Sequence, residues 1–241
     1  MKNLFLLFSF VLCTITTLFA QDTEGHIVYT IELSSDDPQM QMAIPMFSSS
    51  TMEMYFSDNN SRTELSMGTF ITTTIITDVK KDKMLMLMSG MMGQMAISGV
   101  LSEMKEKAEK TNARDPQDDN IETEDAEEEY EIEFTDETKE IQGYTCKKAI
   151  VSSADGVEMI YWYTEEIQFA KDGQNYFNKD VPGFPMEFET FNNGMKLKMK
   201  LTVTEYNKSL GKNASELFDF TIPDGYKEMT IEELEKMGQG G

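Results

Sequence analysis

Methionine is the residue type in this chain that most suggests chemistry. The sequence holds 20 methionines, concentrated in the region 40–104. Residues two apart share one face of a strand, and the repeats with this spacing are Met40-x-Met42, Met52-x-Met54 and Met84-x-Met86-x-Met88. Thioether sulfur is a ligand for Cu(I), and the flexible side chain also adapts to apolar molecules. Three interpretations therefore stay open: a methionine-filled core, a groove for an apolar ligand, and a Cu(I) site.

Other nucleophilic or metal-binding side chains are scarce. His26 is the only histidine, and Cys146 is the only cysteine besides Cys13 near the N-terminus. One histidine and one cysteine cannot form the usual zinc sites or a histidine-dependent catalytic triad. We expect Cys146 to be buried and unpaired. The alternative is a reactive thiol whose pKa is lowered by Lys147 and Lys148.

Carboxylates are so abundant that their positions carry little information. Residues 115–140 contain 14 acidic side chains and one lysine, but lack the Asp-x-Asp-x-Asp-Gly order of an EF-hand loop. A glycosidase needs two buried carboxylates at a defined separation, and Glu165 and Glu166, close in sequence to Trp162, are the pair considered for this role. We therefore expect no catalytic residue, metal or cofactor, and no enzymatic activity.

The charge and the N-terminus indicate where the protein functions. A formal charge of −22 opposes binding to nucleic acid. Residues 1–20 have the pattern of a cleaved signal peptide, with Lys2, an apolar run and Ala20. Bulky Leu12 before Cys13 makes attachment as a lipoprotein the less favoured alternative. Later segments are too short to span a bilayer. We expect an exported protein, periplasmic or secreted and not integral to the membrane, with one domain over residues 21–241.

Alternating apolar residues predict a mainly β protein of about ten strands. The clearest strand is 195–206, in which Leu197, Met199 and Leu201 point inward while lysines point outward. Further strands are expected over 25–34, 50–56, 61–67, 69–78, 83–89, 129–134, 144–153, 157–164, 186–191 and 217–222. Short turns rich in Asn, Asp and Gly connect many of them. The sheet should therefore be antiparallel and should curl into a half-barrel.

Helical spacing replaces this alternation after residue 91. Ile97, Leu101 and Met104 recur at intervals typical of a helix, which we expect over 94–110 and across the apolar side of the sheet. A mobile acidic loop should follow near 111–128. Thr230 and Glu233 form a capping box that should begin a short C-terminal helix. On adjacent strands, the glutamates 129, 131 and 133 would pair with the lysines 196, 198 and 200. If the two strands are not neighbours, the lysines instead form a basic stripe, a candidate surface for a partner.

Several motifs resemble a known family. Residues 139–149 (KEIQGYTCKKA), 161–164 (YWYT) and 181–185 (VPGFP) are similar to exported proteins of the domain-of-unknown-function 4412 family, close in pattern to the GLPGLI-type family. The early segments 54–56, 61–64 and 76–78 resemble the family too. The motif residues, which we expect to be structural, are Gly143, Tyr144, Cys146, Lys147, Trp162, Pro182 and Gly183. By analogy, the resemblance implies the fold of the LolA-like lipoprotein carriers, an antiparallel half-barrel around a hydrophobic groove.

The sequence thus favours non-enzymatic binding or carrying of an apolar ligand, a lipid or a lipidated chain. The residues expected to line the groove or its lid are Met52, Met54, Met84, Met86, Met88, Leu101 and Met104. The rival hypothesis is a structural or interaction protein of the cell envelope that has a filled core and acts through a protein partner. Binding of Cu(I) by methionine is a third and weaker hypothesis.

Overall fold

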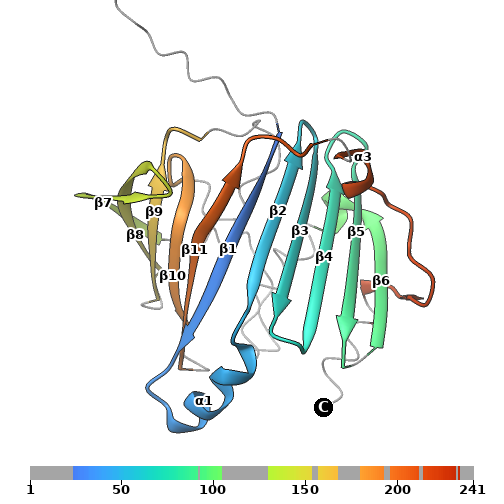
Figure 1. The fold of residues 1–241 in the computed structure, drawn as a ribbon, viewed down its shortest axis with the longest axis horizontal. Coiled ribbons are helices and arrows are strands. Elements are labelled where there is room, and N and C mark those ends of the chain that lie inside the picture. Colours follow the sequence, from blue (N-terminus) through green and yellow to red (C-terminus); the bar gives the residue numbers. More distant parts are fainter. Residues whose placement is uncertain are drawn as a thin grey trace, which may run out of the picture.

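The computed structural model describes residues 24–91, 93–104, 130–153, 157–167, 180–192, 196–211, 214–231 and 233. The expected signal peptide and acidic loop lie outside these residues. A single 12-stranded sheet dominates the fold (Figure 1). The confirmed fold class is therefore mainly β, with one curved, open and chiefly antiparallel sheet.

Strands and short helices alternate along the chain as follows. The first half contains β1 (Glu24–Ser34), α1 (Pro38–Ala43), the 3-10 helix η1 (Ile44–Phe47), β2 (Thr51–Ser57), β3 (Asn60–Met67), β4 (Ile71–Asp78), β5 (Lys83–Gly90) and β6 (Gly93–Val100). The second half contains β7 (Tyr130–Ile141), β8 (Tyr144–Ser153), β9 (Glu158–Thr164), β10 (Phe184–Asn192), β11 (Leu197–Asn207), α3 (Ala214–Leu217) and β12 (Lys227–Glu228).

The sheet consists of two antiparallel meanders joined in the middle. Its strand order is β12-β6-β5-β4-β3-β2-β1-β11-β10-β9-β8-β7. The first strand, β1, pairs with β11. The first strand of one meander therefore lies beside the last strand of the other, at the centre of the sheet. Only β12 is parallel to its neighbour, β6. This topology leaves β7 at one edge of the sheet and the two-residue strand β12 at the other.

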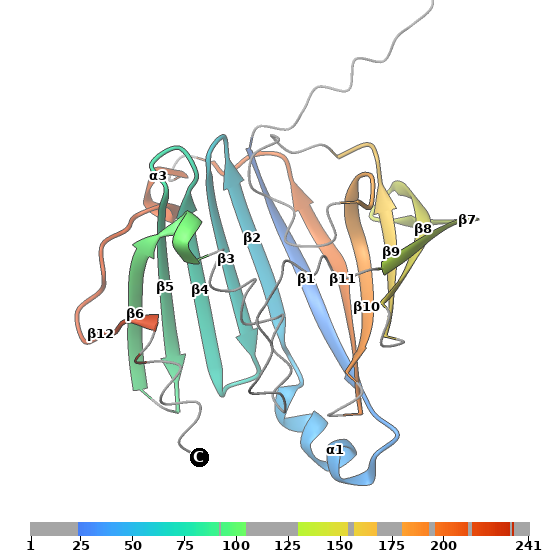
Figure 2. The same ribbon diagram turned by 180° about the vertical axis from the view of Figure 1, so that it is seen from behind.

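The two faces of the sheet differ in polarity. Ile27, Tyr29 and Ile31 of β1 are buried on one face, with Leu201 and Val203 of β11 beside them. We call this side the inner face; it points toward the viewer in Figure 2. His26, Glu32 and the lysines of β11 lie on the opposite, outer face. The alternation predicted for β1 and β11 is thus confirmed, because every second side chain enters the core.

Part of the outer face is covered as well. Ile76 of β4 and Leu85 of β5 point outward yet are 1% and 0% exposed. The segment after β11 crosses in front of these strands, and α3 lies over β4 and β5 (Figure 1). Arg62 holds it there by donating from Nη1 to the Leu217 carbonyl, 3.3 Å away. The outer side of β5 is therefore shielded from water at Leu85 although it is apolar.

Two predicted elements are wrong. Residues 94–100, expected to begin a helix, form most of β6 and pair with β5 along the length of that strand. Helical residues start only at Leu101, and 105–110 lie outside the described part. The strand expected over 217–222 is absent, because Ala214–Leu217 is a helix and the residues after it take no regular structure.

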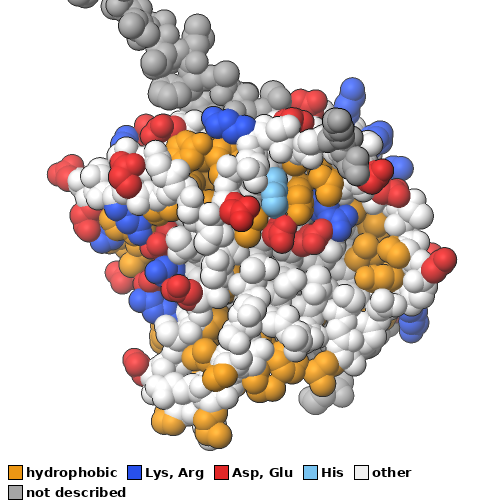
Figure 3. All heavy atoms as spheres, viewed as in Figure 1, with side chains coloured by type: hydrophobic (Ala, Val, Ile, Leu, Met, Phe, Trp, Pro, Cys, Tyr) orange, Lys and Arg blue, Asp and Glu red, His pale blue; other side chains and the backbone are white. Residues whose placement is uncertain are grey.

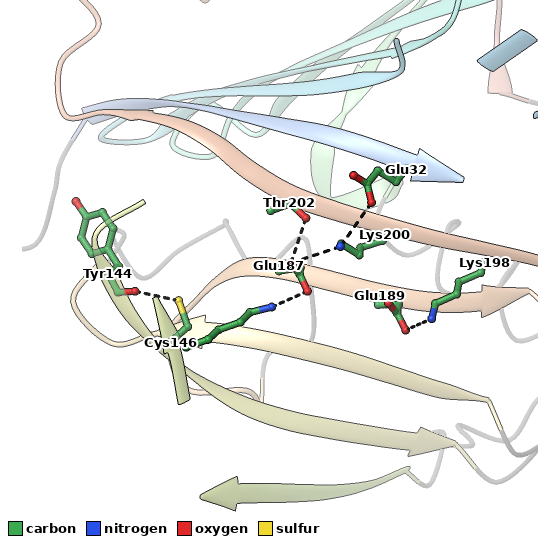
Figure 4. A network of polar contacts seen from close by, with 9 residues as sticks. Glu32, Tyr144, Cys146, Glu187, Glu189, Lys198, Lys200 and Thr202 are labelled. Atoms are coloured by element: carbon green, nitrogen blue, oxygen red, sulfur yellow. Dashed lines mark hydrogen bonds and ion pairs between the residues drawn. The ribbon is translucent and has the colours of Figure 1, made fainter. Parts of the chain in front are cut away.

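The predicted pairing of glutamate and lysine ladders is also wrong. β7 and β11 are separated by β8, β9 and β10, so the two sets of side chains are not neighbours. The lysines of β11 pair instead with acids of the adjacent strands: Lys198 with Glu189 at 2.6 Å, and Lys200 with Glu32 at 3.5 Å (Figure 4). The lysine ladder is therefore compensated by glutamates and does not form a free basic stripe.

Two local predictions are confirmed, one in the β2–β3 turn and one near the C-terminus. The Asp58–Asn59 turn joins β2 and β3 in a hairpin, with a positive φ of 47° at Asp58. The capping box forms as predicted: Glu233 Oε2 accepts from the Thr230 amide at 2.9 Å, and Thr230 Oγ1 accepts from the Glu233 amide at 3.2 Å. Among the described residues, no helix is long and apolar enough to cross a membrane.

Candidate functional site

Strand pairing places the predicted methionines together on the inner face. Side chains of directly paired residues point to the same side of a sheet, so each row of partners across β2 to β6 shares one face. The first row is Met52, Leu65, Thr73, Met88 and Met95. The second is Met54, Thr63, Ile75, Met86 and Ile97, and the third is Phe56, Ser61, Thr77, Met84 and Gly99. We call these rows the methionine face.

Two methionine groups frame this face, and two strands separate them. Met52 and Met54 lie on β2, while Met84, Met86 and Met88 lie on β5, three strand spacings or roughly 14 Å away. Met54 is 6% exposed, and the other four side chains are half-buried. The middle of the face therefore belongs to β3 and β4, where threonine alternates with Leu65 and Ile75.

The two predicted lid residues lie at the edge of the face, after β6. Leu101 is 6% exposed, and its amide donates to the Asp82 carbonyl at 3.2 Å. Asp82 also accepts from the Ser102 amide at 2.9 Å and so caps the first turn of this helix. Met104 packs on Gly99, where an added Cβ would meet its sulfur at 3.3 Å. The described helical residues, 101–104, thus cover the β6 end of the methionine face.

One hydroxyl in the middle of the methionine face has no hydrogen-bond partner. Among the described residues, Thr63 Oγ1 is a buried side-chain oxygen that makes no hydrogen bond. Thr63 lies between Met54 and Ile75 in the second row. In the adjacent row, by contrast, Ser61 and Thr77 satisfy each other with a hydroxyl pair at 2.6 Å. A buried unpaired hydroxyl costs about 1–3 kcal/mol, so the Thr63 site is suited to a ligand that carries a polar group.

A cluster of thioethers gathers at the β5–β6 edge of the sheet. Met95 and Met229 are buried together with Ile97. The half-buried side chains of Met86, Met88 and Met104 pack against them. Met229 reaches this position because β12 pairs with β6 and the Met229 amide then donates to the Ala96 carbonyl at 2.9 Å. Sequence spacing did not predict that this C-terminal methionine joins those of the first half.

The other half of the inner face is a packed core. Tyr29 is 0% exposed and donates its hydroxyl to the Pro185 carbonyl at 2.9 Å. Its ring lies 6.2 Å from that of Phe184, and Met186 beside them is also 0% exposed. Burial raises the pKa of Tyr29 well above its ordinary value, so this hydroxyl stays protonated. The region around β1, β10 and β11 is therefore filled by the protein's own side chains.

Cys146 is buried, as the sequence predicts. It is a free cysteine with 0% exposure, in the same core cluster as Ile141 and Ile167. Burial raises the pKa of the Cys146 thiol to about 11, although the charge of Lys139 opposes this. Since the thiolate is the reactive form, the side chain is an inert thiol at neutral pH. The sulfur lies 3.5 Å from the Tyr144 carbonyl oxygen (Figure 4).

Sequence reasoning missed a polar cluster on the outer face of β1 and β2. The His26 and Tyr55 rings stack with centroids 4.2 Å apart. Glu53 Oε2 lies 3.1 Å from His26 Nε2 and accepts from the Tyr55 hydroxyl at 2.6 Å. Burial and the hydrogen bond to Glu53 raise the pKa of Tyr55 far above its usual range. A pocket of about 370 Å³ adjoins the two rings, lined also by residues 207–210. Only the pairing of β1 with β2 creates this cluster.

The family-motif residues hold turns and strand contacts together. Gly143 completes the β7–β8 turn with φ of 79°, and Lys147 pairs with Glu165 at 3.0 Å. Trp162 lies under Lys139, whose Nζ is 4.2 Å from the ring centre. Gly183, which follows Pro182, has φ of 117°, and an added Cβ would lie 2.4 Å from the Thr164 carbonyl oxygen. Glycine is therefore required at position 183 by both conformation and space.

No cation site is evident in the described part of the chain. Within it, no group of three or more His, Cys, Asp or Glu side chains is arranged to hold a metal ion. A second surface pocket, of about 320 Å³, lies on the outer face between β9 and β10 and is lined by Ile160, Glu189, Phe191 and Lys198 among others. Neither surface pocket includes a residue of the methionine face.

The fold places the chain among mainly β proteins built on one open, curved and chiefly antiparallel sheet. The chain belongs to the family described as Domain of unknown function (DUF4412), which matches residues 38–179. No curated protein matches the sequence.

The solved structures to which this chain is similar are distant in sequence. MucB is 11% identical, with a TM-score of 0.40 over 84% of this chain and 58% of its own length. A DUF1329 family protein from Desulfovibrio piger is 10% identical, with a TM-score of 0.36 over 84% of this chain and 92% of its own. A LolA superfamily protein from Nitrosomonas europaea is 9% identical, with a TM-score of 0.23 over 82% and 90%.

Proposed function

We propose that this protein is exported and that, without catalysing a reaction, it binds or carries an apolar molecule on its methionine face. A lipid or a lipidated chain is the class of ligand that fits such a surface. The face combines flexible thioethers, which repack around varied apolar shapes, with the unpaired hydroxyl of Thr63. That hydroxyl is the observation that carries the proposal, because a buried polar group without a partner is rare in native proteins.

Half-burial of the methionines is consistent with this role. Met52, Met84, Met86 and Met88 are neither fully buried nor exposed, unlike the core around Tyr29. A ligand laid along the rows would cover the remaining apolar surface and gain about 25 cal/mol for each Å² removed from water. Thr63 Oγ1 is closed to solvent, so the polar end of the ligand reaches it only after the side chains beside it move aside. The apolar chain of the ligand would then run toward Met86 or Met54.

The proposal is tested by titrating the delipidated protein with a fluorescent fatty acid. We expect saturable uptake at one site. Thr63→Val keeps the shape of the side chain and removes its hydroxyl, so uptake should weaken at least threefold. The free variant should be as stable as the wild type or more stable, because it loses an unsatisfied polar group. Ser61→Ala is the matched control: its hydroxyl is already paired with Thr77, so uptake should persist while stability falls.

If the wild type takes up no fatty acid, the proposal is contradicted. The rival function, an envelope protein that acts through a protein partner, is then favoured. Mass spectrometry of material extracted from the native protein provides an independent reading. A bound lipid of defined mass supports the carrier, whereas repeated extraction of none supports the filled core. The packed region around Tyr29 and Met186 is the observation that favours this rival.

Cu(I) binding is the third and weaker candidate, and it rests on five methionine side chains that pack together at the β5–β6 edge: Met86, Met88, Met95, Met104 and Met229. Thioethers select Cu(I) over harder cations. Competition against a Cu(I) chelator tests this function. Replacing Met95 and Met229 by leucine conserves volume and should abolish binding, whereas the same change at Met52 and Met54, outside the cluster, should leave it unchanged.

A further inference from the structure

Three segments at one end of the sheet expose methionine side chains to solvent. Met42 on α1 is 82% exposed, Met46 on η1 is 54% exposed, and Met91 in the β5–β6 turn is 80% exposed. The three segments lie at the same end of the molecule, where α1 projects beyond the strands (Figure 1). We call these three side chains, with the segments 38–50, 67–71 and 90–91, the methionine rim.

Hydrogen bonds join the rim segments into one unit. The amide of Gly68 in the β3–β4 turn donates to Ser50 Oγ at 3.1 Å, and Ser50 Oγ donates to the Phe47 carbonyl at 2.7 Å. On the other side of that turn, the Met91 amide donates to the Phe70 carbonyl at 3.2 Å. The rings of Phe47 and Phe70 pack with centroids 5.5 Å apart. Backbone contacts thus hold the exposed methionines in fixed relative positions.

Two glycines allow these segments to approach closely. An added Cβ at Gly68, where φ is 56°, would lie 2.4 Å from the Met46 carbonyl oxygen. At Gly90 it would lie 2.1 Å from the Phe70 carbonyl oxygen. Real Cβ atoms do not approach backbone so closely, so both positions require glycine. The rim is therefore a built part of the fold and not a frayed loop.

The rim segments themselves carry no charged side chain, although Asp36, Asp37 and Lys196 lie beside the start of α1. The chain has no Asp, Glu, Lys, Arg or His in 38–52, 65–77 and 84–102, although its formal charge is −22. At the opposite end, the turns carry Asp58, Asp78, Asp82 and the lysines 80, 81 and 83. Figure 3 shows this polarity: the end with α1 is mostly orange and white, and red and blue side chains gather toward the other end and the sides.

We propose that the methionine rim docks the protein on a lipid surface without net charge, such as the zwitterionic interface of a bilayer. Each exposed methionine can place its apolar thioether among the lipid headgroups and acyl chains. The charges at the start of α1, Asp37 and Lys196, are already paired with each other at 3.4 Å. The acidic remainder of the protein stays in water and directs the rim toward the surface. The same acidity opposes docking on anionic lipid.

The composition of the rim favours a lipid surface over a protein partner. Protein interfaces depend on a few rigid anchors, chiefly Trp, Tyr and Arg, and segments 38–50, 67–71 and 90–91 contain none of these. The rim offers instead three flexible, unbranched side chains on separate segments, which adapt to a fluid surface. Docking of this kind does not depend on whether the methionine face carries a ligand.

Flotation with phosphatidylcholine vesicles tests the proposal, using the protein recovered after export by the expressing cell. We expect the wild type to float with the vesicles, equally at low and high salt because no exposed rim charge is screened. A triple variant, Met42→Asp, Met46→Asp and Met91→Asp, should lower the partition coefficient at least tenfold. The same three positions changed to leucine should retain binding. Phe134→Asp is the matched control, since Phe134 is 52% exposed on β7, away from the rim.

Each outcome either supports or overturns docking on lipid. Equal flotation of the triple aspartate variant and the wild type overturns it, as does binding only to anionic phosphatidylglycerol vesicles. If the wild type is a dimer in sedimentation velocity and the triple variant is a monomer, the rim is an interface between copies of this chain. That result would also overturn docking on lipid. Fatty-acid uptake in solution separates the two proposals: the triple variant should retain uptake, and Thr63→Val should retain flotation.

Discussion

Lys139 on the edge strand β7 forms an ion pair with Glu187 on β10, with Nζ 2.7 Å from Oε1, although β8 and β9 lie between these strands in the sheet. The Glu187 side chain is only 14% exposed and also accepts from Thr202 Oγ1 at 3.2 Å (Figure 4). The lysine stem crosses Trp162 on the way. One carboxylate thus ties the edge of the curved sheet to its centre.

Glu187→Gln should therefore destabilise the protein. The change keeps the shape but removes the charge that Lys139 requires, leaving a half-buried ammonium group without its acid. We expect a loss of about 1–3 kcal/mol in the free energy of unfolding, measured with urea. Glu189→Gln is the control: its partner Lys198 is 46% exposed, so the loss should stay below about 1 kcal/mol. Equal losses in both variants would contradict the special role of Glu187.

Cys146 should make folding stability depend on pH in alkaline solution. In the unfolded chain the thiol ionises near its ordinary pKa of 9.0, whereas burial raises the pKa to about 11 in the folded protein. Between these values the folded state binds more protons than the unfolded state, so stability falls as pH rises. The loss is on the order of 2 kcal/mol and is absent below pH 9.

Urea unfolding of the wild type and Cys146→Ala across this pH range measures the effect. Only the wild type should show the thiol-dependent loss, while Tyr29 titrates in both chains and cancels in the comparison. In the native protein, a thiol reagent should react slowly at pH 8 and much faster once urea unfolds the chain. Fast labelling of the native protein would show that Cys146 is a reactive thiol.

Gly90→Ala should disrupt the rim from inside. The added methyl group would meet the backbone oxygen of Phe70 at 2.1 Å, and backbone cannot move as a side chain does. We expect a loss of about 1–3 kcal/mol, measured by thermal or urea unfolding. Gly99→Ala is the control, because its methyl group meets only the flexible end of Met104 at 3.3 Å and should cost less than about 1 kcal/mol. If both variants were equally stable, the close approach of β5 to the β3–β4 turn would be wrong.

Sequence periodicity predicted most strands because one face of each strand enters the core. It failed at β6, where Met95 and Ile97 alternate as in a strand while Ile97, Leu101 and Met104 recur as in a helix. The apolar positions satisfy both periods, so spacing alone could not decide. Pairing with β5 decides it, because a strand over 93–100 satisfies the backbone groups of β5 that would otherwise form a free edge. The glycines at 93 and 99 also disfavour a helix.

Local sequence patterns likewise could not predict which distant strands pair in the sheet. The glutamates of β7 and the lysines of β11 are complementary in charge, yet strand order depends on how the two meanders join, and nothing local encodes that β1 inserts beside β11. Alternation places the predicted methionines of each strand on one side of that strand. The pairing register from β2 to β5 puts the two groups on the same face. That Met229 joins them required the parallel pairing of β12 with β6.

By itself, the amino-acid sequence determined the local properties of this protein: which side chains alternate, where turns reverse the chain, and that charge is absent from three of its segments. These follow from backbone sterics and composition, which act over a few residues. Only the tertiary structure decided that those uncharged segments meet at one end, that Thr63 lies unpaired between Met54 and Ile75, and that Lys139 reaches Glu187. Such contacts join residues far apart in the chain, and the free energy of packing the whole sheet selects them.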